Sequence, residues 1–170
     1  MNVLLPADRI QKRVEEMAVR ISEDYAGKPL VIVGVLNGCL MFLADLVRHL
    51  DHPLRIGFIQ ASSYRGETTT SGELVFGAEI LPDLVGCNVL LLDDILDTGQ
   101  TLSRLSAAFK KRGVKSLKIG VFVRKIGRQT MAVEPDYVGF EIPDKFVIGY
   151  GLDYNDEYRH LPFLAELPDG

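Results

Sequence analysis

Residues 89–101 read VLLLDDILDTGQT, and most of the fold can be predicted by working outward from this segment. Its first four residues are apolar, which is typical of a strand buried on both faces, as in a parallel sheet. Apolar residues then recur at helical spacing, at Leu102, Leu105, Ala108 and Phe109. Basic residues fill the last turn of this helix, and Gly113 follows as its end. The strand–turn–helix unit points backbone N–H groups and a helix N-terminus at one place, which suits a phosphate.

Three acids in the same segment, Asp93, Asp94 and Asp97, would repel that phosphate. The conflict disappears if they face another part of the same ligand, such as hydroxyls, a metal ion or a basic nitrogen. The alternative is that Asp97 or Thr98 caps the helix and the acidic pair is solvated where the strand leaves the core. We favour the ligand-binding interpretation because it accounts for the whole segment.

A second strand–turn–helix unit precedes the first. Residues 30–36 form an apolar strand, Asn37-Gly38 is a turn dipeptide, and a helix with Leu43, Leu46, Val47 and Leu50 on one face follows. An earlier helix carries the stripe Ile10, Val14, Met17 and Ile21, with Asp8 as its expected cap. Parallel strands end at the same edge of a sheet, so the Asn37-Gly38 turn should face the acidic segment as a candidate anion site.

The bulk properties fit one globular domain of 170 residues. A net charge of −4 does not favour nucleic-acid or anionic-membrane partners, and no apolar stretch is long enough to span a bilayer. The first ten residues lack an apolar signal region. Cys39 and Cys87 match no zinc or redox spacing, so we expect two buried free thiols and a cytoplasmic protein.

Further strands are expected at residues 54–61, 74–76, 117–123, 137–140 and 146–150. Between the first two, residues 62–72 have no apolar anchor apart from the ring of Tyr64, so this segment should be mobile. It could be a surface hairpin or a lid that closes over a reactive centre to exclude water.

Residues 91–101 resemble the phosphoribosyl-pyrophosphate (PRPP) signature of the type I phosphoribosyltransferases. Residues 140–154 resemble the segment with which the hypoxanthine-guanine branch of that family holds a purine. The resemblance implies an α/β, Rossmann-like fold with a central, mostly parallel sheet flanked by helices. Residues 1–170 would form a single domain, with a flexible lid at about 62–73 and a base-binding hood at about 125–165, to which the N-terminus contributes.

The resemblance also implies roles for individual residues. Asp97 would be the general base, and Asp93 and Asp94 would hold the ribose hydroxyls. The remaining assignments are the 5-phosphate turn (Thr98, Gly99, Gln100, Thr101), the pyrophosphate contacts (Leu36, Asn37, Gly38, Arg159), the lid residues (Ser63, Tyr64), the purine contacts (Lys125, Phe146, Val147, Asp153) and the metal ligands (Asp153, Asp93, Asp94).

The implied reaction moves a 5-phosphoribosyl group from PRPP to hypoxanthine and/or guanine. It gives IMP or GMP and pyrophosphate, depends on Mg²⁺, and proceeds through an oxocarbenium-like transition state under the closed lid. Relatives are homodimers or homotetramers. Two departures are visible: Gln100 stands where some relatives have lysine, and Arg124 beside Lys125 leaves open which of the two reaches the base.

Two other functions fit parts of the pattern. RNA-binding regulators share the fold, but they carry tyrosine at the position of Asp97 and need a basic face. A phosphorylated receiver-type domain also has paired acids at strand ends, but it needs neither the turn at 98–101 nor the Lys125–Phe146 pair. The enzyme accounts for more of the chain.

Overall fold

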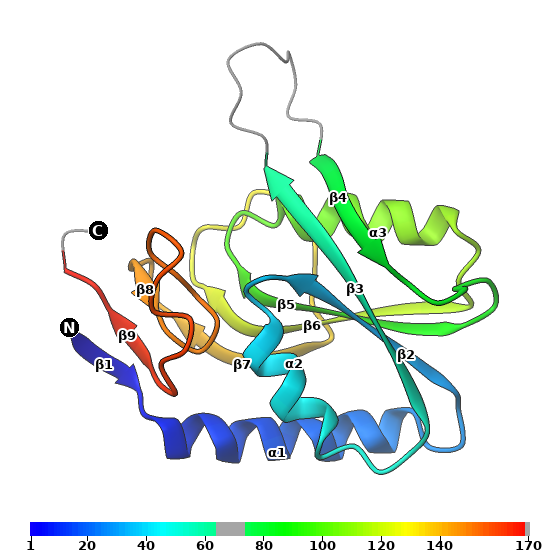
Figure 1. The fold of residues 1–170 in the computed structure, drawn as a ribbon, viewed down its shortest axis with the longest axis horizontal. Coiled ribbons are helices and arrows are strands. Elements are labelled where there is room, and N and C mark those ends of the chain that lie inside the picture. Colours follow the sequence, from blue (N-terminus) through cyan, green and yellow to red (C-terminus); the bar gives the residue numbers. More distant parts are fainter. Residues whose placement is uncertain (64–73, 169–170) are drawn as a thin grey trace.

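The centre of the molecule is a six-stranded sheet (Figure 1). Its strands are β2 (Leu30–Leu36), β3 (Leu54–Ser63), β4 (Leu74–Ile80), β5 (Asn88–Leu96), β6 (Ser116–Lys125) and β7 (Tyr137–Ile142). The computed structural model describes residues 1–63 and 74–168. The strand order is β4-β3-β2-β5-β6-β7, and neighbours are parallel except for the antiparallel edge pair β3–β4. The expected α/β class with a mostly parallel sheet is confirmed.

Helices cover both faces of this sheet (Figure 1). The helices are α1 (Ala7–Asp24), α2 (Leu40–Val47) and α3 (Gln100–Lys111). Leu90 and Leu92 of β5 pack with the buried side chains of α1 and α2, whereas Val89 and Leu91 pack with those of α3. Successive residues of a strand point to opposite faces, which explains why β5 is apolar without interruption. No helix in the described part of the chain is long and apolar enough to cross a bilayer.

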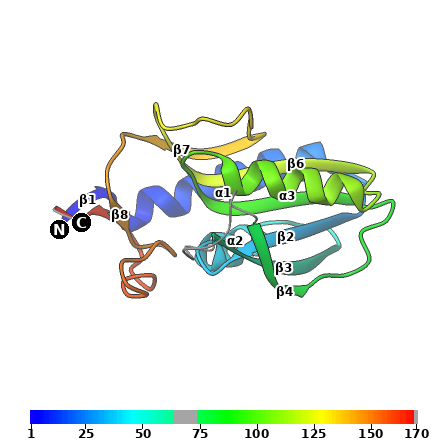
Figure 2. The same ribbon diagram turned by 90° about the horizontal axis from the view of Figure 1, so that it is seen from above.

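A small second sheet lies at one end of the molecule (Figure 2). It has the order β1-β9-β8 and consists of β1 (Asn2–Leu5), β9 (Leu164–Glu166) and β8 (Val147–Ile148). The Tyr150 hydroxyl, just after β8, donates a hydrogen bond to Asp45 Oδ2 on α2 at 2.6 Å. This hydrogen bond connects the segment after β8 to helix α2.

Several local expectations were wrong. Helix α1 begins at Ala7 after Pro6, so Asp8 is not its cap but lies in the first turn, where a negative charge favours the helix dipole. Leu50 lies beyond the end of α2. The strand expected at 146–150 is reduced to Val147–Ile148. Of the two thiols, Cys39 is buried, but Cys87 is partly exposed.

Candidate active site

The carboxyl ends of β2 and β5 border a cavity of about 270 Å³. Its walls include the turns at residues 36–38 and 97–101, the acids Asp93 and Asp94, and Arg159. A smaller cavity of about 180 Å³ is lined by Lys125, Phe146, Val147, Leu152 and Asp153. Asp94 and Ile95 line both cavities, so the two adjoin at the end of β5. Both strand–turn–helix units therefore meet at one edge of the sheet, as predicted.

Asp93 and Asp94 lie within β5 rather than after it, because the strand continues to Leu96. Asp93 is only 7% exposed, and its Oδ1 accepts a hydrogen bond from the Asp94 amide at 2.9 Å. Burial raises the pKa of Asp93 well above its usual value, and the neighbouring charge of Asp94 adds to the rise. Burial also raises the pKa of Asp94, although hydrogen bonds and the charge of Arg159 oppose it. Asp93 is therefore buried rather than solvated, which contradicts the alternative interpretation for that residue, whereas Asp94 is partly exposed and lines both cavities.

The turn at 98–101 leads directly into α3. Gly99 is the N-cap residue and has φ +88°, a left-handed conformation that favours glycine. Since Gly99 occupies the N-cap position, Asp97 is not the cap of the helix. The Thr98 carbonyl accepts hydrogen bonds from the amides of Thr130 (2.9 Å) and Met131 (3.1 Å). The Thr98 Oγ1 accepts a hydrogen bond from the Gln100 amide at 3.4 Å, so Thr98 contacts the first residue of α3, as the capping alternative expected of it. The turn is held from behind by the segment after β6, and it places the N-terminus of α3 at the cavity, where an anion is favoured.

The turn at Asn37-Gly38 is packed tightly on two sides, and the Leu36–Asn37 peptide is cis. A Cβ placed on Gly38 would overlap the Asp94 carboxylate. On the other side, a Cβ placed on Gly151 would overlap the Gly38 carbonyl. The backbone of Gly38 therefore separates the acidic pair from the segment that follows β8.

The smaller cavity has the features of a site for a flat ring. Phe146 is 41% exposed and packs edge-on against Tyr154, with ring centroids 5.6 Å apart, so it is not a core residue. Lys125 lines the cavity, whereas Arg124 forms an ion pair with Glu134 at 3.0 Å. Of the two basic residues, Lys125 is the one that lines the cavity, and its contact with the base stays a prediction.

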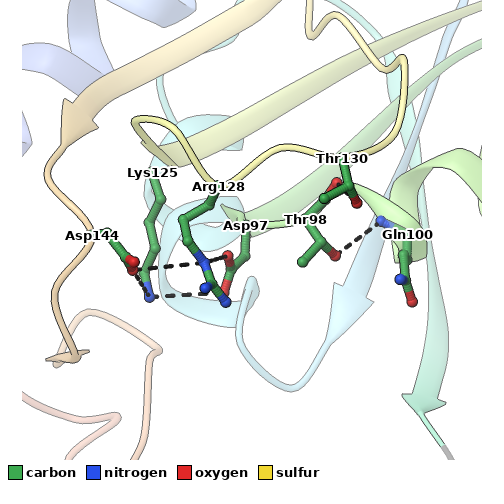
Figure 3. A network of polar contacts seen from close by, with 7 residues as sticks. All are labelled: Asp97, Thr98, Gln100, Lys125, Arg128, Thr130 and Asp144. Carbon is green, nitrogen blue, oxygen red and sulfur yellow. Dashed lines mark hydrogen bonds and ion pairs between the residues drawn. The ribbon is translucent and has the colours of Figure 1, made fainter.

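Four charged side chains meet beside this cavity (Figure 3). Arg128 Nε donates to Asp97 Oδ1 at 2.9 Å, and Lys125 Nζ lies 3.7 Å from Asp97 Oδ2. Both cations also lie near Asp144 Oδ1, Lys125 at 3.6 Å and Arg128 at 3.7 Å. The hydrogen bond to Asp97, with the charges of Asp97 and Asp144, raises the pKa of the Arg128 guanidinium. Asp97, which lines the larger cavity, is thus close to Lys125, which lines the smaller one.

The acids of the site fit a hard cation such as Mg²⁺, which takes the rest of its ligands from water and from the substrate. No group of three or more His, Cys, Asp or Glu side chains is arranged for metal binding within residues 1–63 and 74–168. Asp153 instead forms an ion pair with Arg159 at 3.0 Å. Mg²⁺ commonly uses one or two carboxylates together with substrate phosphates and water, so a complete protein cage is not needed.

The structure brings together most of the residues that the sequence singled out. Those that line the two cavities are Leu36, Asn37, Gly38, Asp93, Asp94, Asp97, Thr98, Gly99, Gln100, Thr101, Arg159, Lys125, Phe146, Val147 and Asp153. Tyr64 and the rest of the expected lid up to residue 73 lie outside the described residues, whereas the backbone of Ser62 and Ser63, its first two residues, belongs to the end of β3. The roles themselves stay predictions.

Sequence reasoning missed Arg128, Thr130 and Asp144. Each lies in a connecting segment, at no distinctive spacing from the acidic motif. The available signal was that residues 126–128 follow a strand that pairs with β5, and this signal is too weak to select a residue.

Comparisons with known proteins agree with this geometry. A family model described as "Phosphoribosyl transferase domain" matches residues 3–155. The chain is 43% identical over 166 residues to a hypoxanthine-guanine phosphoribosyltransferase of Staphylococcus epidermidis, covering 98% of this chain and 93% of the relative. It is 40% identical over 167 residues to the Streptococcus pneumoniae protein of that name, with the same coverage.

Solved structures give the same result. The crystal structure of a Staphylococcus aureus hypoxanthine phosphoribosyltransferase is similar with a TM-score of 0.92 and 41% identity, covering 98% of this chain and 91% of the other. A Bacillus anthracis hypoxanthine-guanine phosphoribosyltransferase has a TM-score of 0.91 and 36% identity, with 98% of each chain covered. The expected fold family is confirmed.

Proposed function

The chain belongs to the phosphoribosyltransferase family, and we propose that it transfers a 5-phosphoribosyl group from PRPP to hypoxanthine and/or guanine in purine salvage. The observation that carries this proposal is the pair of adjoining cavities that share Asp94 and Ile95. A sugar phosphate fits the cavity with the helix N-terminus, and a flat base fits the cavity with the exposed aromatic ring. The reacting bond would then lie where the two cavities join.

The base end favours a 6-oxopurine. Phe146 supplies a face for stacking at a low entropy cost. Lys125, at 12% side-chain exposure, carries a cationic donor that can bind an exocyclic oxygen. Adenine presents an amino group at that position and cannot accept this hydrogen bond, so it should be rejected. Val147 would offer backbone groups to the edge of the ring.

The sugar end supports loss of pyrophosphate. As the bond to pyrophosphate breaks, positive charge develops on the ribose ring, and the buried Asp93 and the partly exposed Asp94 would favour that charge and hold the hydroxyls. Asp97 would accept the purine proton. Residues 98–101 would hold the 5-phosphate, and the Asn37-Gly38 turn with Arg159 would receive the leaving group. Bound Mg²⁺ would neutralise the pyrophosphate, with Asp153, Asp93 and Asp94 as its candidate protein ligands.

No observation favours the RNA-binding alternative. Asp97 stands where those regulators carry tyrosine, and it is in contact with Arg128 and near Lys125. The cytoplasmic location and the homodimer or homotetramer stay predictions.

The test is a steady-state assay with PRPP, Mg²⁺ and one base at a time, reading nucleotide and pyrophosphate together. We expect hypoxanthine or guanine to be converted and adenine not. In the Asp97→Asn variant, kcat should fall by roughly 10²–10⁴-fold, because that is the usual contribution of a general base. PRPP binding, measured by calorimetry, should change little. If the wild-type protein releases no pyrophosphate with any 6-oxopurine, the proposal is wrong.

A further inference from the structure

Arg128 holds one particular oxygen of Asp97. Its Nε donates to Oδ1 at 2.9 Å, while Oδ2 faces Lys125 Nζ at the longer distance of 3.7 Å (Figure 3). The two oxygens of the carboxylate are therefore not equivalent. One is occupied by a hydrogen bond, and the other is the oxygen nearest the Nζ of Lys125, a residue that lines the smaller cavity.

The segment that carries Arg128 is itself fixed. The amides of Thr130 and Met131 donate to the Thr98 carbonyl. The Gln129 side chain donates to the carbonyls of Met131 and Val133 and accepts a hydrogen bond from Arg124. Residues 128–131 therefore support the Asp97–Thr98 backbone and the Asp97 side chain together.

This arrangement contributes little to folding. The side chains of Arg128, Asp97 and Asp144 are 45%, 37% and 51% exposed. Ion pairs at such exposure are screened by water and usually add little to stability. Replacement of Arg128 should therefore leave the fold intact, and its effect should appear in turnover.

We propose that Arg128 is a positioning residue for proton transfer, which holds Asp97 through Oδ1 and leaves Oδ2 as the oxygen that accepts the purine proton. This inference rests on the proposed function. In that step the purine N–H bond breaks and its proton bonds to Oδ2. The electron pair passes through the ring to the nitrogen that bonds to the ribose carbon, as the bond from that carbon to pyrophosphate breaks.

The need for Arg128 arises when the base binds. Lys125 lies near both Asp97 and Asp144, and donation to the purine oxygen would draw its Nζ away from them. Of the two cations in the cluster, Arg128 then remains to separate the two carboxylates. A guanidinium keeps its proton at any working pH, so Arg128 can orient the Asp97 carboxylate without competing for the proton that the purine releases.

The experiment uses the full chain and compares Arg128→Met and Arg128→Lys, each alone and combined with Asp97→Asn. The control is Arg112→Met, which removes an arginine paired with Glu79 at the C-terminal end of α3. We expect Arg128→Met to lower kcat by roughly ten-fold, a part of the general-base contribution, with the Kd of PRPP unchanged. Arg128→Lys should recover part of the loss, and Arg112→Met should behave as wild type.

The combined variants are decisive. If Arg128 acts through Asp97, then Arg128→Met should lower the residual kcat of Asp97→Asn by less than about two-fold, since residues that act as a unit are not additive. This inference would be overturned if Arg128→Met lowered kcat equally in the wild-type and Asp97→Asn backgrounds, or if kcat were unchanged in Arg128→Met. Turnover by the wild-type protein would still support the proposed function in either case. Absence of wild-type turnover would overturn both.

Discussion

At the scale of single residues, the least usual feature is a buried acid that forms no ion pair with any cation in the described part of the chain. Asp93 is 7% exposed, and burial with the charge of Asp94 raises its pKa. The Asp93 carboxylate therefore binds a proton more tightly in the folded protein than in the unfolded chain. Stability should fall as pH rises from the unfolded-state pKa through the raised folded-state pKa. Binding sites commonly retain groups that reduce stability in this way.

Asp93→Asn should accordingly stabilise the ligand-free protein at pH 8. The asparagine carbonyl can still accept the hydrogen bond from the Asp94 amide, and no charge is buried. Each kcal/mol that the substitution adds to the free energy of unfolding should raise Tm by roughly 2–4 °C for a chain of this size. Calorimetry at pH 4 and pH 8 measures the effect, which should be larger at pH 8, while phosphoribosyl transfer is lost. Asp51→Asn, at an exposed position, is the control, and an equal gain there would contradict the explanation.

The sequence predicted the acidic pair at this site but not the burial of Asp93. Asp93 and Asp94 were expected where β5 leaves the core, yet pairing with β6 continues through Asp93↔Val121 to Leu96↔Arg124. The length of a strand depends on its neighbours, and local sequence does not contain that information.

At the scale of elements, the two turns differ in why they need glycine. Gly99 has a positive φ, whereas Gly38 needs space, because a Cβ there would overlap the Asp94 carboxylate. Only the first requirement concerns the local backbone.

Gly38→Ala should therefore damage binding more than stability. The turn must move away from Asp94, and a displacement of about 1 Å at a reacting site can cost 10²-fold in rate. We expect kcat/KM for PRPP to fall by roughly that factor. Gly27→Ala is the control, since Gly27 has open space around it but φ +70°. It should lose roughly 1–2 kcal/mol of stability and keep its kinetics. Normal PRPP kinetics in Gly38→Ala would contradict the steric argument.

The elements themselves were predicted unevenly. Strand β2 and helix α3 were placed correctly because apolar runs, a turn dipeptide and Gly113 mark their bounds. Strands β1 and β9 were missed because they are short and pair with each other from opposite ends of the chain. No local sequence pattern predicts a strand pair of this kind.

At the scale of the whole molecule, the candidate site is divided between two sheets. The six-stranded sheet presents the acids and the phosphate turn, while the segment that includes β8 presents Phe146 and Asp153. A ligand that reaches both sides should stabilise the folded state more than one that reaches a single side.

Thermal unfolding measures this difference. PRPP with Mg²⁺ at about 100 times its Kd should stabilise the protein by roughly 2.7 kcal/mol, which corresponds to about 5–11 °C in Tm. GMP would occupy both cavities, whereas ribose 5-phosphate, the control, reaches only one. At equal concentration GMP should therefore give the larger shift in Tm. Equal shifts for GMP and ribose 5-phosphate would show that the second cavity takes no part.

At this scale, the sequence predicted the face of the molecule that carries the site, because parallel strands end together. It did not predict the cluster of Asp97, Lys125, Arg128 and Asp144. Two of its members lie in connections whose paths are set by tertiary contacts, such as the hydrogen bonds to the Thr98 carbonyl.

The close approach of Gly151 to Gly38 limits how this protein can diverge. Gly151 lies a few residues from Phe146 and Val147, at φ +99°, with its backbone against the carbonyl of the turn that would receive pyrophosphate. An insertion or a larger residue that remodels the base pocket here would push on the leaving-group side. A change of base preference would therefore need a compensating change near Gly38, so nucleobase choice and donor affinity should evolve as one trait.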